Sequence, residues 1–424
     1  MRVLFTFGLN EDGQCGYDES LENNKKFIES VEKFSDESIK REIFSPRAVR
    51  FPNTSIIVVK ISAGSRHTLA LTSNGEVYSW GWGHLGQLGH GNSSNLYSPH
   101  RIGILHDITS ISAGGMHSGC IDKNHYCYTW GASGYGQLGL GTMAVKKTCF
   151  TVPEIVKYTN NIDNESDEKN PLLVSVISCG GMHTGVIDID GYVYCWGKAD
   201  SGQTGSSDWY LNFFPGVAYP RKVLGFEGKA VNISCGGFHT LILTDSNSVY
   251  VMGKEDFGLL GTGNSVENSM SIGAESPTLV QALKEEKIIG FSSGGWHSCF
   301  LTENGQLYVC GKGEYGRLGV GDEKSKTLPT PIGHNHSIVN VSAGGSHTIF
   351  TNTIGEIYTV GRLDGGRCGV GILSSDRIKT PTKINDNFYK SNMHIISLSA
   401  GGSHTTVLVD YPDITNNDFD RYFR

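Results

Sequence analysis

The sequence predicts an all-β protein folded as a seven-bladed β-propeller with four-stranded blades. A short loop pattern, S-A-G-G-x-H in its clearest copies, recurs seven times along the 424 residues. After each of the first six loop histidines, a Gly preceded by an aromatic or apolar residue follows 14 positions later. A G-x-x-G turn begins five residues after each such Gly. Intervals kept constant in repeats of 50 to 66 residues indicate one supersecondary unit with fixed geometry.

Each repeat supplies four strands in a fixed order. In one copy, VVKISAG gives a strand, and TLALT and EVYSW form a hairpin around the turn SNGE. A segment that often opens with proline, such as SPHRIGIL, gives the outermost strand. Proline fits there because an edge strand can spare its backbone N–H. Four strands per repeat are typical of a propeller blade.

The two ends of the chain carry complementary parts of one repeat. The chain starts with the strand RVLFTFG and reaches its last loop histidine in HTTVLVD. We expect these strands to pair in a composite blade, which closes the ring and removes two free edges. The expected organisation is one propeller over residues 1–410, with a C-terminal tail over 411–424.

Three insertions are expected within the propeller, at about residues 17–45, 154–172 and 206–220. The first has Phe27, Val31 and Phe34 at helical spacing, which predicts an amphipathic helix that packs on the propeller or docks a partner. The second is polar over residues 160–170 and predicts a mobile loop. The third carries Trp209 and Phe213 among other aromatic residues, which either cover a blade edge or form a binding hot spot.

Composition excludes several classes of function. The net charge is −7, and no Lys/Arg-rich run is present, so we expect no direct binding to nucleic acid. No stretch approaches the roughly 18 apolar residues of a membrane span, and we expect no membrane contact. The ten cysteines form no C-x-x-C pair and are interpreted as small buried residues in a reducing compartment, the cytoplasm or the nucleus. We expect a monomer.

The loop histidines favour a structural role. One per blade at the same turn, they are spread around a ring and cannot converge on one metal ion. We expect each imidazole to hydrogen bond to loop backbone beside flexible glycines, and we expect no metal and no cofactor. The structural set is His67, His117, His183, His239, His297, His347 and His404. No Walker A, H-E-x-x-H or G-x-S-x-G motif occurs, and no catalytic residue is predicted.

The residue before each loop histidine varies and should lie on one face near the channel mouth. Around the ring it is Arg66, Met116, Met182, Phe238, Trp296, Ser346 and Ser403. The four large apolar residues form an exposed crescent or pack into the neighbouring blade. The loops after the third strands should share this face, and they carry acidic residues that predict an acidic rim. The rim residues are Asp12, Asp200, Glu255, Asp256, Glu314 and Asp364.

The stretch ISAGSRHTLALTSNGEVYSWGWGHLGQLGHG resembles the repeat of the regulator of chromosome condensation family, and the resemblance covers about residues 1–410. It implies the propeller fold. The family includes GTPase exchange factors, a plant UV-B photoreceptor, ubiquitin-ligase modules and binding scaffolds. Exchange by the founding mechanism uses acidic residues in the loops before the motif histidine, and no such acid occurs here. The photoreceptor uses clustered loop tryptophans, and here Trp296 is alone.

Two functional hypotheses follow. The first is a non-enzymatic scaffold that binds a protein partner on one propeller face through Arg66, Met116, Met182, Phe238 and Trp296. Asp200, Asp256, Trp209 and Phe213 complete this predicted set. The second is a guanine-nucleotide exchange factor for a Ran-like small GTPase, which needs only differential binding and no covalent chemistry.

Overall fold

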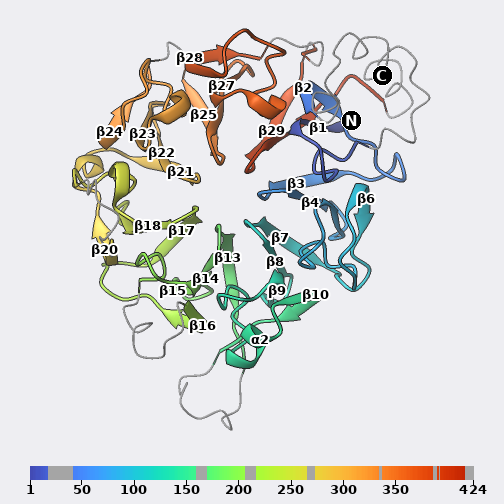
Figure 1. Ribbon diagram of the computed structural model, residues 1–424, viewed down its shortest axis with the longest axis vertical. Coiled ribbons are helices and arrows are strands. Elements are labelled where there is room, and N and C mark those ends of the chain that lie inside the picture. The colour runs from blue at the N-terminus through green and yellow to red at the C-terminus, as the bar shows by residue number, and fades with distance from the viewer. Residues whose placement is uncertain are drawn as a thin grey trace.

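The protein forms a ring of seven four-stranded antiparallel sheets around a central axis, as Figure 1 shows. The computed structural model describes residues 1–17, 42–158, 170–205, 216–264, 273–333, 337–384, 389–390 and 392–415. The seven-bladed propeller predicted from the repeats is confirmed.

Each blade has an inner strand at the axis and three strands outside it. The inner strands are β3 (Val58–Ala63), β7 (Ile108–Ala113), β13 (Val174–Cys179), β17 (Ala230–Cys235), β21 (Ile288–Ser293), β25 (Ile338–Ala343) and β29 (His394–Ala400). The second strands are β4 (His67–Thr72), β8 (His117–Asp122), β14 (His183–Asp188), β18 (His239–Thr244), β22 (His297–Thr302), β26 (His347–Asn352) and β30 (His404–Asp410).

The outer half of each blade follows the same order. The third strands are β5 (Val77–Gly81), β9 (Cys127–Ala132), β15 (Val193–Lys198), β19 (Val249–Gly253), β23 (Leu307–Gly311), β27 (Ile357–Arg362) and β1 (Arg2–Leu9). The outer strands are β6 (Leu96–Arg101), β10 (Cys149–Ile155), β16 (Gly216–Lys222), β20 (Ala274–Leu279), β24 (Lys326–Pro331), β28 (Arg377–Lys383) and β2 (Glu42–Ala48). Blades 1 to 6 run from β3–β6 to β25–β28, and β29, β30, β1 and β2 form the closing blade.

A few short elements decorate the blades. The helix α2 (Thr142–Lys146) precedes β10, and the strands β11 (Lys157–Tyr158) and β12 (Asn170–Pro171) form a two-stranded ribbon. Short 3-10 turns are η4 (Asp256–Gly258), η5 (Gln281–Leu283), η6 (Glu314–Gly316) and η7 (Asp364–Gly366).

The hydrophobic core lies between neighbouring blades rather than at one centre. One buried cluster joins Leu69 and Val77 of blade 1 to Ile111 and Trp130 of blade 2, and comparable clusters fill the other junctions. The second strands are buried at nearly every residue because they have a sheet neighbour on both sides and a blade on each face. The outer strands are mostly half-buried or exposed, and in β6 and β20 the one buried residue is the proline. All ten cysteines are free, and nine of them are buried.

The 14-residue interval from histidine to glycine is the register of the central hairpin. His67 of β4 lies opposite Gly81 of β5, and the same pairing recurs in every blade. Gly81 has φ +107°, and a Cβ there would lie 2.7 Å from the Cα of His67. Only glycine fits such a close approach in the left-handed region.

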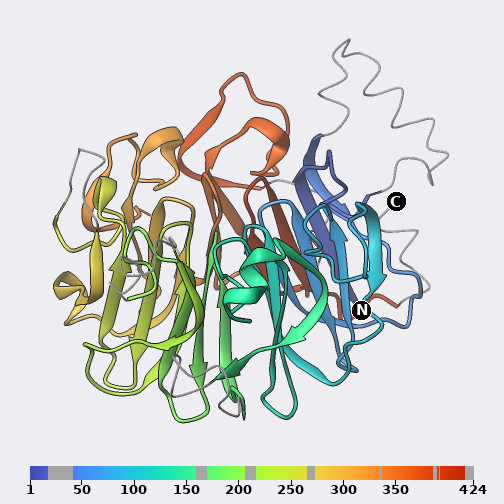
Figure 2. The same ribbon diagram turned by 60° about the horizontal axis from the view of Figure 1, so that its bottom comes forward.

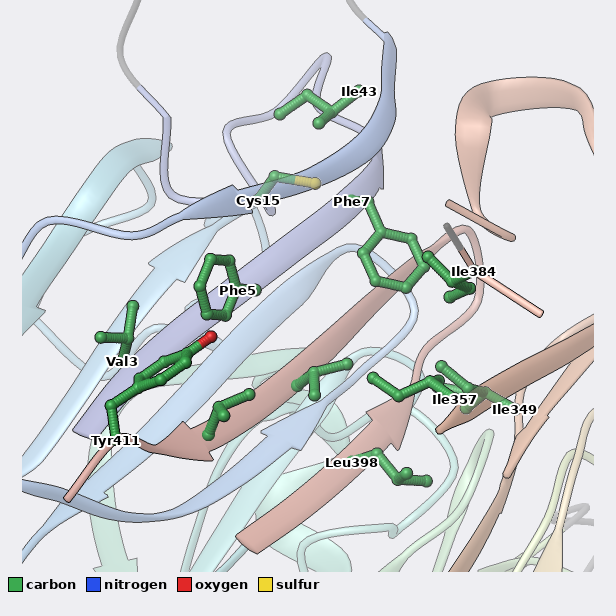
Figure 3. Packing of buried hydrophobic residues seen from close by; sticks show 13 residues of the cluster. Val3, Phe5, Phe7, Cys15, Ile43, Ile349, Ile357, Ile384, Leu398 and Tyr411 are labelled. Atoms are coloured by element: carbon green, nitrogen blue, oxygen red, sulfur yellow. The ribbon is translucent and has the colours of Figure 1, made fainter. Parts of the chain in front are cut away.

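The closing blade joins the two ends of the chain as predicted. Its sheet order is β2-β1-β30-β29, and Gly8 of β1 faces His404 of β30 in the register of the other blades. The N-terminal ammonium donates to the carbonyl of Tyr411 at 2.7 Å. Tyr411, which the sequence placed in the tail, is buried edge-on against Phe5 with ring centroids 6.4 Å apart (Figure 3).

The expected insertions lie largely outside the described residues. This is so for the predicted helix with Phe27, Val31 and Phe34, and for Trp209 and Phe213. The described ends of the insertions are β2, the β11–β12 ribbon and β16, which carries Tyr219.

Four sets of hydrogen bonds join each blade to the next, and each set closes into a ring. Between blades 1 and 2, the Nε2 of His67 lies 2.8 Å from the Oγ of Ser118, and that hydroxyl donates to the carbonyl of Gln87 at 2.9 Å. The N–H of Ser65 donates to the carbonyl of Gly114 at 3.1 Å, and the N–H of Ala113 donates to the Oγ of Ser62 at 2.9 Å. The circle ends where His404 contacts Thr68 and Gly402 contacts Gly64.

These contacts correct the role expected of the histidines. Each imidazole bonds to a hydroxyl of the next blade and not to the backbone of its own loop. The partners are Ser118, Thr184, Thr240, Ser298, Thr348, Thr405 and Thr68. Each hydroxyl already donates its proton to a carbonyl, so the histidine Nε2 must carry the proton and Nδ1 must be bare.

Burial holds the seven imidazoles neutral. All are fully buried, and their Nδ1 atoms have no hydrogen-bond partner among the described residues. Burial lowers the pKa of His67 and His183 to about 4, and that of His117, His239 and His404 to about 3. For His297 and His347 burial lowers the pKa further, and the buried Arg317 and Arg367 add to the effect.

The first prediction concerns acid stability. Because the folded-state pKa values lie below about 6.5, the unfolded chain binds more protons as the pH falls from 6.5 toward 5. Each ring histidine should then remove about 1.4 kcal/mol of unfolding free energy per pH unit, a loss absent above pH 7. Urea unfolding across this range should show the slope. His183→Gln should reduce the slope by about 1.4 kcal/mol per pH unit, the share of one of the seven histidines, whereas His106→Gln, at an exposed position, should leave it unchanged. An unchanged slope in His183→Gln would contradict the assignment.

The second prediction concerns the loop glycines. A Cβ on Gly114 would lie 2.5 Å from the carbonyl oxygen of Gly180 in the next blade, whereas one on Gly103 would meet no atom within 4 Å. Gly114→Ala should therefore cost about 1–3 kcal/mol through overpacking. Gly103→Ala is the control and should leave the melting temperature nearly unchanged. Equal melting temperatures for both variants would refute this explanation of the motif.

Candidate functional site

One face of the propeller, here called the loop face, carries both sets of variable loops. The residue before each loop histidine accepts a hydrogen bond from the residue after the conserved glycine of the hairpin. Lys198 N–H, for example, donates to the carbonyl of Met182 at 2.9 Å, and Lys254 N–H donates to that of Phe238 at 3.0 Å. The loops after the third strands therefore share this face with the histidine loops, as the sequence suggested.

Three of the four residues of the predicted crescent, together with Arg66, lie around a cavity at the mouth of the channel. Arg66, Met116, Met182 and Phe238 come from four consecutive blades and line a cavity of about 390 Å³. Trp82 and Lys198 complete its side-chain walls, and the loop backbones at Ser65, Gly115, Gly181 and Gly237 form the rest. The four crescent side chains, Met116, Met182, Phe238 and Trp296, are all half-buried, although Trp296 does not line the cavity. They are neither fully exposed nor part of the interblade core.

The crescent continues beyond the cavity as a group of aromatic rings. The rings of Phe238 and Trp296 lie 4.4 Å apart between centroids, tilted by 39°. Phe257, from the loop after β19, meets Trp296 edge-on at 5.8 Å and is 38% exposed. Phe238 and Trp296 are half-buried because they pack on one another, and Phe257 remains exposed beside them.

The sequence analysis predicted a negatively charged rim on this face, and that prediction is wrong because cations neutralise most of its carboxylates. Five of its six carboxylates contact a cation: Asp12 contacts Arg66 at 2.6 Å, and Asp200 contacts Lys198 at 3.0 Å. The same holds in the pairs Asp256–Lys254, Glu314–Lys312 and Asp364–Arg362. Glu255 alone has no ion pair among the described residues. The rim is thus a circle of ion pairs, and the attraction it was expected to exert on a positive partner is largely cancelled.

Each rim cation also packs over an aromatic ring. Lys254 lies 5.3 Å from the ring centroid of Trp296, Lys312 lies 4.9 Å from that of Phe257, and Arg66 lies 5.8 Å from that of Trp82. Such contacts contribute about 0.5–1 kcal/mol at exposed sites. Each cation therefore contacts both a carboxylate and an aromatic ring, which links the rings to the rim.

Sequence reasoning missed several of these residues. Trp82, Lys198, Lys254, Lys312 and Arg362 were not singled out, although a signal was present. All five follow the conserved glycine of the hairpin directly, so they occupy one structural position in five blades. Two further rings that were missed, Phe257 and Tyr315, occupy equivalent positions in successive blades.

The described part of the chain shows no constellation for metal chemistry. No three His, Cys, Asp or Glu side chains in the described ranges could hold a metal ion together. Within the same ranges, no helix has the length and apolar character needed to cross a bilayer.

Comparison with known proteins agrees with the fold and the repeat. The family model of the RCC1-like domain matches residues 160–407, and that of the regulator of chromosome condensation (RCC1) repeat matches 3–71, 74–121 and 124–187. The chain is 30% identical over 278 residues to the ultraviolet-B receptor UVR8 of Arabidopsis thaliana, covering 65% of this chain and 58% of the receptor. It is 30% identical over 303 residues to the human E3 ubiquitin-protein ligase HERC2, covering 70% of this chain and 5% of the ligase. The alignments thus span less than two thirds of these relatives.

Solved structures share the architecture at lower identity. Prp20p of Saccharomyces cerevisiae superimposes with a TM-score of 0.78 at 21% identity, covering 99% of this chain and 93% of that one. Human WBSCR16 superimposes with a TM-score of 0.76 at 18% identity, covering 97% and 100%. These likenesses establish the fold. With the repeat matches, which together extend from residue 3 to residue 407, they identify the chain as a member of the RCC1-like family of seven-bladed propellers.

Proposed function

We propose that this chain is a non-enzymatic protein-interaction module that binds a protein partner on the loop face. The observation that carries the proposal is the cavity at the channel mouth, whose side-chain walls include Met116, Met182 and Phe238. Half-exposed apolar groups gathered around a hollow are typical of protein-binding surfaces.

The cavity suits the insertion of one or two side chains of a partner. Methionine adapts to different shapes because it is unbranched and flexible, and two of the walls are methionines. The backbone beneath them is rigid, since the loops of neighbouring blades hydrogen bond to each other around the ring. A rigid base with adaptable walls favours binding of an apolar anchor without a large ordering cost.

The solved structures of similar proteins suggest which class of partner to expect. The solved structure of Prp20p is described with that protein's binding to Gsp1p and histones, and a second structure shows Kap60 bound to yeast RCC1. These are interactions with proteins, made by a protein that shares this fold. For this chain we propose a protein partner in the same sense, with its identity set by the variable residues of the loop face.

The third prediction tests the face. Met182→Asp places a charge in the apolar wall and should weaken binding of proteins captured from a lysate of the source cells by at least about tenfold, the loss of a typical hot spot. The matched control is Ile354→Asp, in the turn between β26 and β27 on the opposite side of the propeller, where the side chain is 63% exposed. Quantitative mass spectrometry of the captured proteins measures the change, and melting temperatures show that both variants fold. Identical sets of captured proteins for Met182→Asp and wild type would refute the proposal.

Nucleotide exchange on a small GTPase is the alternative function. The fold likeness to Prp20p favours it, but no acidic residue occupies either position before any of the seven loop histidines.

The fourth prediction separates the two functions. Because no acidic residue occupies either position before any of the seven loop histidines, we expect the chain to leave fluorescent GDP release from a panel of small GTPases at the intrinsic rate. Acceleration that is abolished by Met182→Asp would establish exchange instead and assign it to the same face.

A further inference from the structure

Two aromatic residues on the loop face have a backbone conformation that their side chains disfavour. Phe257 has φ +60° and ψ +10°, and Tyr315 has φ +62° and ψ +9°. Bulky residues rarely adopt this left-handed region. The equivalent residue of the next blade is Gly365, at φ +67° and ψ +9°, where no such strain arises. Glycine would therefore form this turn without strain. The presence of aromatic residues at these two positions needs an explanation other than the turn itself.

The strain arises from the loss of a side-chain cap. In the closing blade and blades 1 to 3, a glutamine accepts the N–H of the residue two positions earlier. The pairs are Asp12–Gln14, Leu85–Gln87, Tyr135–Gln137 and Ser201–Gln203, at 2.9 to 3.0 Å. None of these four capped residues has a positive φ. In blades 4 to 6 the glutamine is replaced by Leu259, Arg317 and Arg367, the cap is absent, and the turn adopts the left-handed form.

Tyr315 lies among arginines. Its ring centroid is 4.7 Å from the guanidinium of Arg362, 5.7 Å from that of Arg377 and 5.9 Å from that of Arg317. Its phenol oxygen has no hydrogen-bond partner within the described ranges. The ring thus provides an apolar surface and a free hydroxyl at the centre of a cationic neighbourhood.

The cations around Tyr315 share too few carboxylates. Glu314 contacts both Lys312 and Arg317, at 2.7 and 3.5 Å. Glu323 contacts both Arg377 and Lys379, at 2.6 and 2.8 Å. Asp364 likewise contacts two arginines, Arg362 and Arg367, and Asp376 contacts only Arg377.

We call this group the Tyr315 cluster. It contains six cations, Lys312, Arg317, Arg362, Arg367, Arg377 and Lys379, and four carboxylates, Glu314, Glu323, Asp364 and Asp376. A fifth carboxylate, Glu42, faces Asp364 and Arg367 at the far edge. With Glu42 included, the cluster has six cations and five carboxylates, a net charge of +1 on a chain whose net charge is −7. Arg317 and Arg367 are buried and donate to loop carbonyls, so the cations within reach of a partner are Lys312, Arg362, Arg377 and Lys379.

We propose that the Tyr315 cluster binds an acidic segment of the protein partner. Carboxylates of that segment contact the exposed cations, above all Arg362, which shares Asp364 with the buried Arg367. Charge-assisted hydrogen bonds to guanidinium groups are strong and geometrically selective. The ring of Tyr315 packs against the backbone of the segment. This inference rests on the proposed function and names the chemistry of a second contact beside the cavity.

The fifth prediction uses synthetic probes. A fluorescein-labelled peptide in which glutamate alternates with serine should bind the full chain roughly tenfold more tightly than the same peptide with glutamine, at low ionic strength. Fluorescence polarisation measures both affinities. Tyr315→Gly and Arg377→Gln should each reduce the preference several-fold. Tyr315→Gly should not lower the melting temperature, because glycine removes the left-handed strain.

The controls separate this inference from its alternatives. Lys287→Gln, which removes an exposed cation before β21 on the opposite face, should leave the preference intact. Equal affinity for the glutamate and glutamine peptides would overturn the inference, as would tighter binding of a single-stranded oligonucleotide. So would a Tyr315→Gly protein that keeps full preference. If the glutamate and glutamine peptides bind equally well but Met182→Asp still reduces the capture of proteins from the lysate, the proposed function stands without this contact.

Discussion

The hydrogen bond from each loop histidine to the hydroxyl of the next blade is the contact on which the rest of the structure depends. This bond crosses the junction between two neighbouring sheets and is fully buried. The hydroxyl that accepts it also donates its own proton to a carbonyl of the blade that carries the histidine. A neutral imidazole can donate from only one nitrogen, so this arrangement fixes both the tautomer and the orientation of each ring. Because the last histidine contacts the first repeat, the seven bonds form one closed circuit. A blade at the edge of an open array would lack one partner.

This closed circuit of hydrogen bonds explains why the residue before each loop histidine can vary although the histidine itself is the same in every repeat. The loop backbones are fixed by the histidine behind them and by the N–H···O=C bonds between adjacent loops. The residue before each histidine needs to satisfy none of these bonds, so Met182, Phe238 or Ser346 can stand at the same position without changing the blade. The propeller thus separates its stability, which lies in the repeated residues, from its recognition, which lies in the residues that differ.

The loop face is not symmetric, and its asymmetry has a physical origin. Where glutamine caps the turn, the loop keeps an ordinary conformation; where leucine or arginine replaces it, the turn becomes left-handed. The same replacements place Arg317 and Arg367 under the face, where each donates to a loop carbonyl of the next blade at 3.3 and 3.1 Å. Apolar residues therefore occupy one part of the rim, and partly compensated cations occupy another.

The sequence by itself determined the number of blades, the closing blade and the register of each hairpin. These follow from intervals within one repeat, and a spacing of 14 residues between His67 and Gly81 is a local constraint that any hairpin of that length must satisfy. It also placed Met116, Met182 and Phe238 on one face, because equivalent positions of a repeat lie on equivalent surfaces. The tertiary structure alone decided that the histidines bridge blades, that the acidic rim is paired, and that Phe257 and Tyr315 are strained. The histidine contacts depend on side chains that meet across junctions, 50 or more residues apart in the sequence, and on the angle at which one blade follows another. Four of the five rim ion pairs join residues only two apart, and the strain at Phe257 and Tyr315 arises within single turns, so these features depend on how the loop backbone folds, which the residue pattern does not specify.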